Sequence, residues 1–470
     1  VSSLTLTATL AMMVAGPLSD RFGRRNVLVA ASLLYAVSAI GSALAPDFEL
    51  LVIARMIGGL GVGASLIVAP MYIAEFSPPA MRGRVVSFNQ LNIVIGISAA
   101  FFSNYLILRL GQSGAGWTGV LALGEHNWRW MLGLETLPAA LYFFALFAVP
   151  ESPRWLVMHG REEAALDVMT RVCGAEEARK QMGEVKASIA ADAERQQVRI
   201  ADLFVPAMRL VLVIGVVTGI LQQITGINSV FFYAPMIFEQ SGIGTDASFA
   251  QAVLVGLVNV FFTVLAILCI DRLGRKPLLA GGLAGITLSM FVQAYGFSSA
   301  TYTLTPESVA ALPETIQPDL RTLTGQTFEG DIAFKEAARR MMGEEQATRY
   351  ESDLVAGAIS MDPMLVLFGV LGFVASFAIS VGPVMWVLFS ELFPNRIRGI
   401  AISFVGFINS AVSFGVQFIF PWELATLGSA TTFLIYGVFG ALGLLFVVLV
   451  VPETKGKSLE ALEELLVSER

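Results

Sequence analysis

Residues that carry chemistry are scarce in this sequence. Only 14% of its 470 residues are charged, whereas a soluble chain carries about a quarter. Its two cysteines, Cys173 and Cys269, give no disulfide framework, and its two histidines, His126 and His159, have no clustered ligands beside them. The sequence also lacks a Walker A loop, a nucleotide-binding fingerprint and a nucleophile–base–orienter set. We therefore expect no enzyme, no catalytic residue, no cofactor, no metal and no nucleic-acid partner.

Long apolar runs are what the sequence has in abundance. Hydrophobic residues make up 55% of the chain, and its mean hydropathy is +0.71. They form stretches of roughly 20 or more residues, the length that an α-helix needs to cross a bilayer. Because the runs are continuous and do not alternate, membrane-spanning strands are disfavoured. The sequence predicts an all-α membrane protein with eleven spans, at 1–19, 26–45, 50–74, 85–108, 128–149, 207–238, 248–270, 278–298, 363–392, 399–420 and 428–451.

The loops between these spans are basic on one side only. Short basic segments lie at 20–25, 75–84, 271–277 and 393–398, all on the same side. Because basic loops stay in the cytoplasm, we expect this side and the C-terminus to be cytoplasmic in a plasma-membrane protein. The first run has no charged n-region and no cleavage site, so a signal peptide is a poor interpretation. An odd number of spans behind a non-initiator Val1 predicts that an earlier segment is absent from this sequence.

Short motifs recur in the two halves of the chain. "DRFGRR" at 20–25 matches "DRLGRK" at 271–276, "EFSPPAMRGR" at 75–84 matches "ELFPNRIRGI" at 391–400, and "VPESPR" at 149–154 matches "VPETKG" at 451–456. The offset is larger for the later pairs, which indicates an insertion in the second half, at 299–361. Its stretch "DIAFKEAARRMMGEEQ" predicts a surface helix. Membrane proteins built from two such halves are commonly transporters, with the substrate site between the repeats.

The repeated acid–glycine–base motif has a local explanation in turn chemistry. Gly23 permits a tight turn between two spans, and Asp20 is expected near the start of the following helix, where a carboxylate is favourable. Arg24 and Arg25 are expected in the anionic interface of the membrane. Turn chemistry alone explains one copy, but two copies at equivalent places indicate a paired element that locks the two halves together on the cytoplasmic side.

Amide side chains inside the spans are the candidate binding groups. A sugar needs neutral hydrogen-bond partners and an aromatic face, and intramembrane amides are costly unless they have partners. Gln222, Gln223 and Asn228 surround Gly226, which favours a break in that span. The alternative is that such residues only form interhelical hydrogen bonds. Further candidates in other spans are Gln90, Asn259, Asn409 and Trp386, which follows the expected kink at Gly382-Pro383.

The ordered set "GPLSDRFGRR", "PESPRW", "QQITGIN", "GPVMW" and "PETKG" resembles the signatures of the sugar porter family of the major facilitator superfamily. The resemblance covers nearly the whole chain and implies two six-helix bundles, of which the first span is missing here. It implies sugar contacts at Gln90, Gln222, Gln223, Asn228, Asn259, Trp386 and Asn409, with Phe377 in the pocket wall. Where tight-binding relatives often carry Trp, this chain has Ser410, which leaves the sugar open. The implied domains are an N-terminal bundle (1–149), an intracellular helical domain (150–206), a C-terminal bundle (207–451) with the extracellular insertion (299–361), and a cytoplasmic tail (452–470).

The charged motifs predict a latch on the cytoplasmic side, which we call the cytoplasmic gate. Breaking its pairs should favour the inward-open state. We expect Asp20, Arg24, Glu75 and Arg82 to meet, with Asp271, Arg275, Glu391 and Arg398 as the mirror set, and Arg154 and Glu453 nearby.

Arg55 and Glu135 are opposite charges inside spans of the first half. At 1.5 Å per residue their depths are similar, so we expect them to approach each other. One interpretation is a static ion pair; the other is a proton relay. The resemblance implies that an Asp on the absent first span engages the Arg that Arg55 matches.

These observations predict secondary transport of a monosaccharide or polyol by a monomer in the bilayer, with proton symport favoured. Facilitative transport, a sugar receptor without transport, and a non-sugar transporter of the superfamily remain as alternatives.

Overall fold

The computed structural model describes residues 2–76, 82–194, 200–394 and 397–455, without the side chains of 82–87, 188, 190–194 and 271. Among these residues, eleven helical segments are long and apolar enough to cross a membrane. They coincide with the eleven spans expected from the sequence. The contacts divide the chain into two compact units. Unit 1 holds 1–93 and 110–203, and unit 2 holds 94–109 and 204–470.

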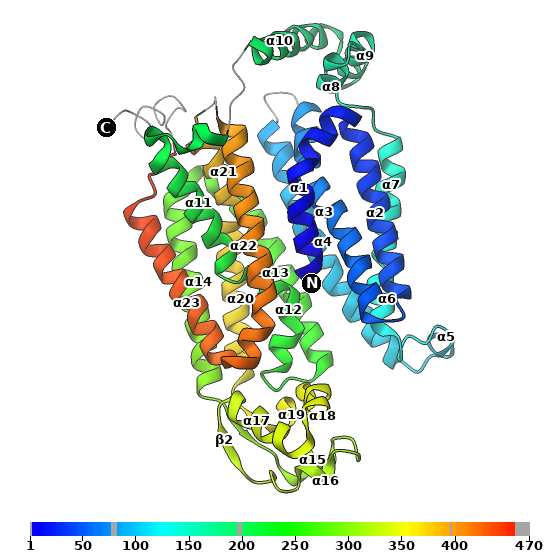
Figure 1. Ribbon diagram of the computed structural model, residues 1–470, viewed down its shortest axis with the longest axis vertical. Helices are drawn as coiled ribbons and strands as arrows, with labels where there is room; N and C mark the ends of the chain where they lie inside the picture. The colour runs from blue at the N-terminus through cyan, green and yellow to red at the C-terminus, as the bar shows by residue number, and fades with distance from the viewer. Residues whose placement is uncertain (1, 77–81, 195–199, 395–396, 456–470) are drawn as a thin grey trace. The chain divides into compact units, whose positions relative to one another are not determined.

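Unit 1 is a helical bundle followed by a small helical domain (Figure 1). Glycines of α3 allow neighbouring helices to approach closely: a Cβ on Gly61 would lie 2.9 Å from the Ala31 carbonyl oxygen, and one on Gly63 would lie 2.8 Å from the Ala11 Cβ. The "GGLGVG" stretch is therefore a packing surface, as its place within a span indicates. The elements are α1 (Ser2–Phe22), α2 (Arg24–Leu44), α3 (Phe48–Phe76), α4 (Arg82–Gln112, whose residues 94–109 group with unit 2), α5 (Gly116–Val120), α6 (Asn127–Gly133), α7 (Thr136–Phe147), α8 (Pro153–Met158), α9 (Glu162–Cys173) and α10 (Ala175–Glu194).

The small helical domain has its own apolar core. Ser152 caps α8 by accepting a hydrogen bond from the Trp155 backbone N–H, at 3.3 Å. Trp155, Ala165 and Met169 are buried there with residues of α10. The apolar face of α9 thus supplies much of the core of this domain, although its sequence is a charged, Ala- and Glu-rich stretch.

Unit 2 contains the second bundle, in which α14 packs against α20 and α23 (Figure 1). Two of its spans are broken near their midpoints, where α11 gives way to α12 and α20 to α21. The elements are η1 (Ile200–Phe204, at the boundary of the units), η2 (Pro206–Met208), α11 (Arg209–Ile224), α12 (Ile227–Glu239), α13 (Thr245–Leu273), α14 (Arg275–Ser298), α20 (Pro363–Ile379), α21 (Val381–Leu392), α22 (Arg398–Thr426) and α23 (Gly428–Leu449).

The insertion 299–361, here called the insertion domain, folds at the end of unit 2 where α14 ends and α20 begins (Figure 1). It encloses an apolar core that includes Tyr302, Phe334 and Leu354. The helix expected in this stretch is present as α17, but it ends at Met342, because Gly343 has a φ of +81°. One of its faces is exposed and the other is buried in this core. A sheet of order β2-β1-β3 completes the domain. Its elements are β1 (Thr301–Thr303), α15 (Pro306–Ala310), α16 (Gln317–Leu320), β2 (Thr327–Glu329), α17 (Asp331–Met342), α18 (Glu344–Arg349), α19 (Glu351–Ala358) and β3 (Ile359–Ser360).

Candidate functional site

The break between α11 and α12 is centred on Gly226. Its φ of +91° is a conformation that residues with a Cβ rarely adopt, and a Cβ there would lie 2.7 Å from the ring of Tyr436. The break expected from "QQITGIN" is therefore present. It places Gln222 and Gln223 in the last turn of α11 and Asn228 in the first turn of α12.

These amides form a continuous hydrogen-bond network with α22. Gln223 Nε2 donates to Asn409 Oδ1 and to Gln222 Oε1, both at 3.2 Å. Asn409 Nδ2 donates to Gln222 Oε1 at 2.8 Å and to the Gly219 carbonyl at 2.8 Å. Asn228 Nδ2 donates to Gln223 Oε1 at 2.8 Å and to Ser413 Oγ at 2.7 Å. We call Gln222, Gln223, Asn228 and Asn409 the amide cluster.

The second broken span meets the amide cluster. Gln222 Nε2 donates to the carbonyl oxygens of Val381 and Gly382, at 3.5 and 3.3 Å, just after the break at Ser380. The kink expected near Gly382-Pro383 is thus present, with Ser380 as its pivot. Both carbonyls lie in the first turn of α21, so the start of this half-helix is within hydrogen-bond reach of a side chain of α11.

The two aromatic candidates flank this second break. Phe377 packs against Gly382, where a Cβ would lie 3.0 Å from its ring. Trp386 is 43% exposed and meets Phe389 edge to face, with ring centroids 5.9 Å apart. A large, partly exposed indole is suited to stack on the apolar face of a sugar ring.

Two predicted contacts are not members of the amide cluster. Asn259 is buried in α13, with 4% exposure, and Gln90 is half-buried in α4 of unit 1. Among the described residues, the hydrogen bonds above include neither of them. The three buried members of the cluster are also bonded across helices, so interhelical bonding and a binding role coexist in the same side chains. That these residues bind sugar stays a prediction.

The first half of the cytoplasmic gate is an ion cluster around Arg24. The Arg24 guanidinium lies 2.8 Å from Asp20 and 3.0 Å from Glu75, and its side chain is only 4% exposed. Two carboxylates and the Ser19 carbonyl compensate for the desolvation of the buried guanidinium. That Arg24 lies at the depth of the membrane interface stays a prediction. The meeting of Asp20, Arg24 and Glu75 is confirmed.

The second half repeats this arrangement in unit 2. Arg275 Nη2 lies 2.8 Å from Glu391, and Glu453 accepts hydrogen bonds from the backbone N–H groups of Arg275 and Lys276, each at 3.1 Å. Burial raises the pKa of Glu453, but the backbone N–H groups of Lys455, Arg275 and Lys276 outweigh it, so the pKa lies below its usual value. Arg398 Nε donates to the Phe393 carbonyl at 3.1 Å.

The carboxylate at the start of α2 is Glu151, not Asp20 as expected. Glu151 Oε1 accepts from the backbone N–H groups of Arg24 and Arg25, at 3.0 and 3.1 Å, as Glu453 does in unit 2. The reason is geometric: Asp20 still lies on α1, four residues before Arg24, and pairs with its side chain. Glu151 was missed, although the match of "VPESPR" with "VPETKG" places it in step with Glu453.

Two hydroxyl groups were missed in the same way. Ser152 Oγ donates to Glu75, and Thr454 Oγ1 donates to Glu391 at 2.6 Å. Both directly follow the repeated glutamate, so the same motif match could have found them. Of the remaining gate residues, Arg154 lies in α8 beside Trp155, whose Nε1 donates to the Asp20 carbonyl. The side chains of Arg82 and Asp271 lie outside the described residues.

Arg55 and Glu135 form the ion pair that their depths predict. Arg55 Nη1 lies 3.1 Å from Glu135 Oε2, and the side chains are 17% and 52% exposed. Glu135 stands between α6 and α7, at the N-cap of α7. The pairing is confirmed, whereas a role in proton coupling stays a prediction.

The chain was also compared with known proteins. The model of the family described as "Sugar (and other) transporter" matches residues 1–311 and 350–466. An arabinose-proton symporter of Bacillus subtilis is 36% identical over 99% of this chain and 85% of that relative. A D-xylose-proton symporter of Escherichia coli is 35% identical over the same shares. The solved structure of the proton:xylose symporter XylE of the major facilitator superfamily, bound to 6-bromo-6-deoxy-D-glucose, is similar with a TM-score of 0.67 at 33% identity, covering 99% of this chain and 88% of that one.

A match over most of the chain, at this identity, establishes the family. The protein belongs to the sugar transporter family and has the fold of the major facilitator superfamily. The resemblance drawn from its motifs is confirmed. Among the described residues, no group of three or more His, Cys, Asp or Glu side chains could hold a metal ion.

Proposed function

We propose that the protein is a secondary transporter that carries a monosaccharide or polyol across the plasma membrane by alternating access, as a proton symporter. The observation that carries this proposal is the amide cluster at the broken span, in a chain of the sugar transporter family. Neutral amides supply both donors and acceptors, which match the hydroxyl groups of a sugar. The names of the relatives, which couple arabinose or D-xylose to protons, support the ion.

The binding mechanism follows from the bonds that the cluster already makes. Gln222, Gln223, Asn228 and Asn409 exchange hydrogen bonds with one another in the absence of substrate. A sugar hydroxyl that inserts replaces such a bond with one of the same kind, so the net free energy per bond is small and binding stays reversible. Gln90, Asn259 and Phe377 complete the proposed contacts, with the indole of Trp386 as the apolar platform.

Alternating access needs a gate that is stronger in one state than in the other. We assign this role to the two charged clusters, one within each unit, because each ties the start of a helix to later segments of its own half. Replacing Arg275 by Ala should raise the inward-open fraction, read as spin-label distances between the halves on the cytoplasmic side. An unchanged distance distribution would remove the clusters from the mechanism.

The proton site is assigned to Arg55 and Glu135. Ionisable side chains inside spans commonly mark ion and proton pathways, and these two lie 3.1 Å apart. The alternative of a static pair is separated from this assignment by proton uptake, as described in the Discussion.

The remaining features of the proposal concern placement in the cell. We place the short basic loops and the C-terminal tail (452–470) in the cytoplasm and the insertion domain outside, because basic loops stay inside. The working unit is a monomer in the bilayer, with the bundles at 1–149 and 207–451 joined by the intracellular domain at 150–206, and it carries out transport rather than a chemical reaction.

The test is uptake by the complete gene product in proteoliposomes. The panel is radiolabelled D-xylose, L-arabinose, D-glucose and myo-inositol, each with and without a protonophore. Concentrative uptake of one sugar that collapses with the protonophore supports symport. Equilibrating uptake insensitive to the protonophore identifies a facilitator, and binding without uptake identifies a receptor.

A further inference from the structure

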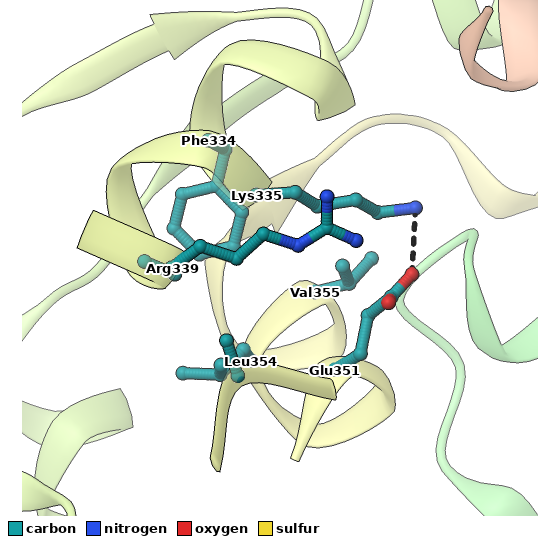
Figure 2. A pocket seen from close by; sticks show the side chains of 8 residues that line it. Phe334, Lys335, Arg339, Glu351, Leu354 and Val355 are labelled. Atoms are coloured by element: carbon teal, nitrogen blue, oxygen red, sulfur yellow. Dashed lines mark ion pairs between the residues drawn. The ribbon is translucent and has the colours of Figure 1, made fainter. Parts of the chain in front are cut away.

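The insertion domain buries a lysine at its centre. Lys335 is 6% exposed, and its Nζ lies 2.9 Å from Glu351 and 3.8 Å from Asp331 (Figure 2 shows Lys335 and Glu351). A buried charge is costly unless it is paired. The hollow beside this pair has room for about one water molecule, far less than a small-molecule pocket. The lysine therefore serves the residues around it rather than a ligand.

Asp331 also reaches the membrane-spanning bundle. Its Oδ2 accepts a hydrogen bond from the backbone N–H of Ser429, at 3.1 Å, and lies 3.4 Å from Ser429 Oγ. Ser429 is in the first turn of α23, where backbone N–H groups lack intrahelical acceptors and a carboxylate is favourable. Gly428 permits this approach, because a Cβ there would lie 2.5 Å from Asp331 Oδ1. One carboxylate thus joins Lys335 of the insertion domain to the start of α23.

Ser429 continues the connection to α12. Its Oγ donates to Gln240 Oε1 at 2.9 Å, and Gln240 is the C-cap residue directly after α12. Both side chains are buried, at 1% and 7% exposure, so water does not compete for this bond. The insertion domain meets the same helix end a second time: a Cβ on Gly242 would lie 2.6 Å from Ile359 of β3.

The other end of α12 is fixed by α23 as well. α12 begins after Gly226, and Gly226 packs against the ring of Tyr436 on α23. α12 is therefore held at both ends by one helix, and that helix is in turn capped by Asp331. Asn228 of the amide cluster lies in the first turn of the helix so held.

We propose that the insertion domain is a positioning element for α12, acting through the contacts Lys335–Asp331–Ser429–Gln240. The domain uses its buried lysine to hold the Asp331 carboxylate, Asp331 orients Ser429, and Ser429 anchors the end of the helix that carries Asn228. Asp331 and Lys335 lie between residues 311 and 350, the part of the chain that the family model does not match. The link from α12 to sugar affinity rests on the proposed function; the tether itself does not.

The first test is hydrogen–deuterium exchange of the full-length protein in lipid nanodiscs, without sugar. Ser429→Ala removes the hydroxyl that donates to Gln240 but keeps the backbone N–H that donates to Asp331. We expect exchange of the last turn of α12 to rise about fivefold, the value of one net hydrogen bond of about 1 kcal/mol. Exchange within the insertion domain should stay unchanged. If Ser429 only stabilised the insertion domain, exchange there would rise instead. Asp331→Asn should have the same effect on α12.

Glu336→Gln is the matched control. It lies on α17 like Asp331 and breaks an exposed pair with Arg340, at 3.3 Å, that does not touch the bundle. If α12 exchanges as in the wild type in both Ser429→Ala and Asp331→Asn, the proposal is overturned. The proposal is also overturned if Glu336→Gln speeds the exchange of α12 as much as these two variants do.

The second test is the KM and maximal rate of uptake in these variants, with the best substrate among D-xylose, L-arabinose, D-glucose and myo-inositol. A raised KM at a retained maximal rate in Ser429→Ala supports the proposal. Faster α12 exchange with an unchanged KM keeps the tether and counts against Asn228 as a sugar contact. The failure of the tether and that of the proposed sugar site are thereby separated.

Discussion

Replacing Gln223 by Ala tests the amide cluster most directly. Gln223 is 8% exposed, its Nε2 donates two hydrogen bonds and its Oε1 accepts one. In the variant, Asn228 Nδ2 keeps Ser413 Oγ as an acceptor, whereas Asn409 Oδ1 loses the hydrogen bond that Gln223 Nε2 donates to it. A sugar hydroxyl bonded to Gln223 would lose its partner too.

The cost of leaving a buried polar group without its partner is about 1–3 kcal/mol. Sugar affinity should therefore fall about 5- to 150-fold, since about 1.4 kcal/mol corresponds to a factor of ten. Because the bonds within the cluster are exchanged for bonds to the sugar, the lower part of this range is expected. The assay is isothermal titration calorimetry on the detergent-solubilised full-length protein, with its thermal unfolding measured in parallel.

Gln293→Met is the control for this experiment. Gln293 is a fully buried amide of α14 whose Nε2 donates to Met290 Sδ at 3.8 Å, and the cluster described above does not contain it. A dissociation constant of Gln223→Ala equal to that of the wild type, with intact folding, would refute the site. Equal losses in both variants would show that any buried amide has this effect.

Three further outcomes are expected. Glu135→Gln should lower sugar-driven proton uptake and leave the sugar dissociation constant within about twofold, because an amide keeps a bond to Arg55 but takes no proton; equal proton uptake would leave Glu135 a structural role. Gly226→Ala should cost at least about 1–2 kcal/mol of stability in thermal unfolding, since φ of +91° and the Tyr436 ring both oppose a Cβ, whereas Gly281→Ala, with nothing within 4 Å of its Cβ, should not; equal melting temperatures contradict the argument. Glu453→Gln should be less stable than the wild type above about pH 5 and approach it in acid. A carboxylate whose folded pKa is lowered stabilises the fold above its unfolded pKa, and this contribution is lost as pH falls through the folded pKa. A difference in unfolding free energy between variant and wild type that stays constant with pH would rule out the titration of Glu453.

The spans and their breaks could be predicted because they depend on local signals. Length and apolarity define the helices, and Gly226 and Gly382-Pro383 mark the interruptions. The Arg55–Glu135 pair was predictable as well, since both depths follow from the helical rise. In each case the signal lies within one span, or at the same depth in two spans, so it can be found without knowing how the helices pack.

Contacts that depend on the packing of distant segments were not predictable. The core of the insertion domain is built from short helices and strands whose apolar residues have no long periodic pattern, so its sequence suggests a surface helix alone. Glu151 reaches the start of α2 only because the segment after α7 packs against it, and this packing has no local signal in the sequence. Amides show the same limit: their type indicates a polar site, but which amide donates to which follows only from the arrangement of α11, α12 and α22.

The glutamates that follow the last span of each half bear on the order in which the protein is made. Glu151 comes 127 residues after the N–H of Arg24 that it accepts, and Glu453 comes 178 residues after that of Arg275. During synthesis each bundle enters the membrane one span at a time, so neither bond can form until the last span of its half has left the ribosome. The hydrogen bonds of each glutamate can therefore form only after all the spans of its bundle have been made. A half that lacks its final span lacks the carboxylate as well, so the N–H groups at the start of α2 or α14 are left without this acceptor.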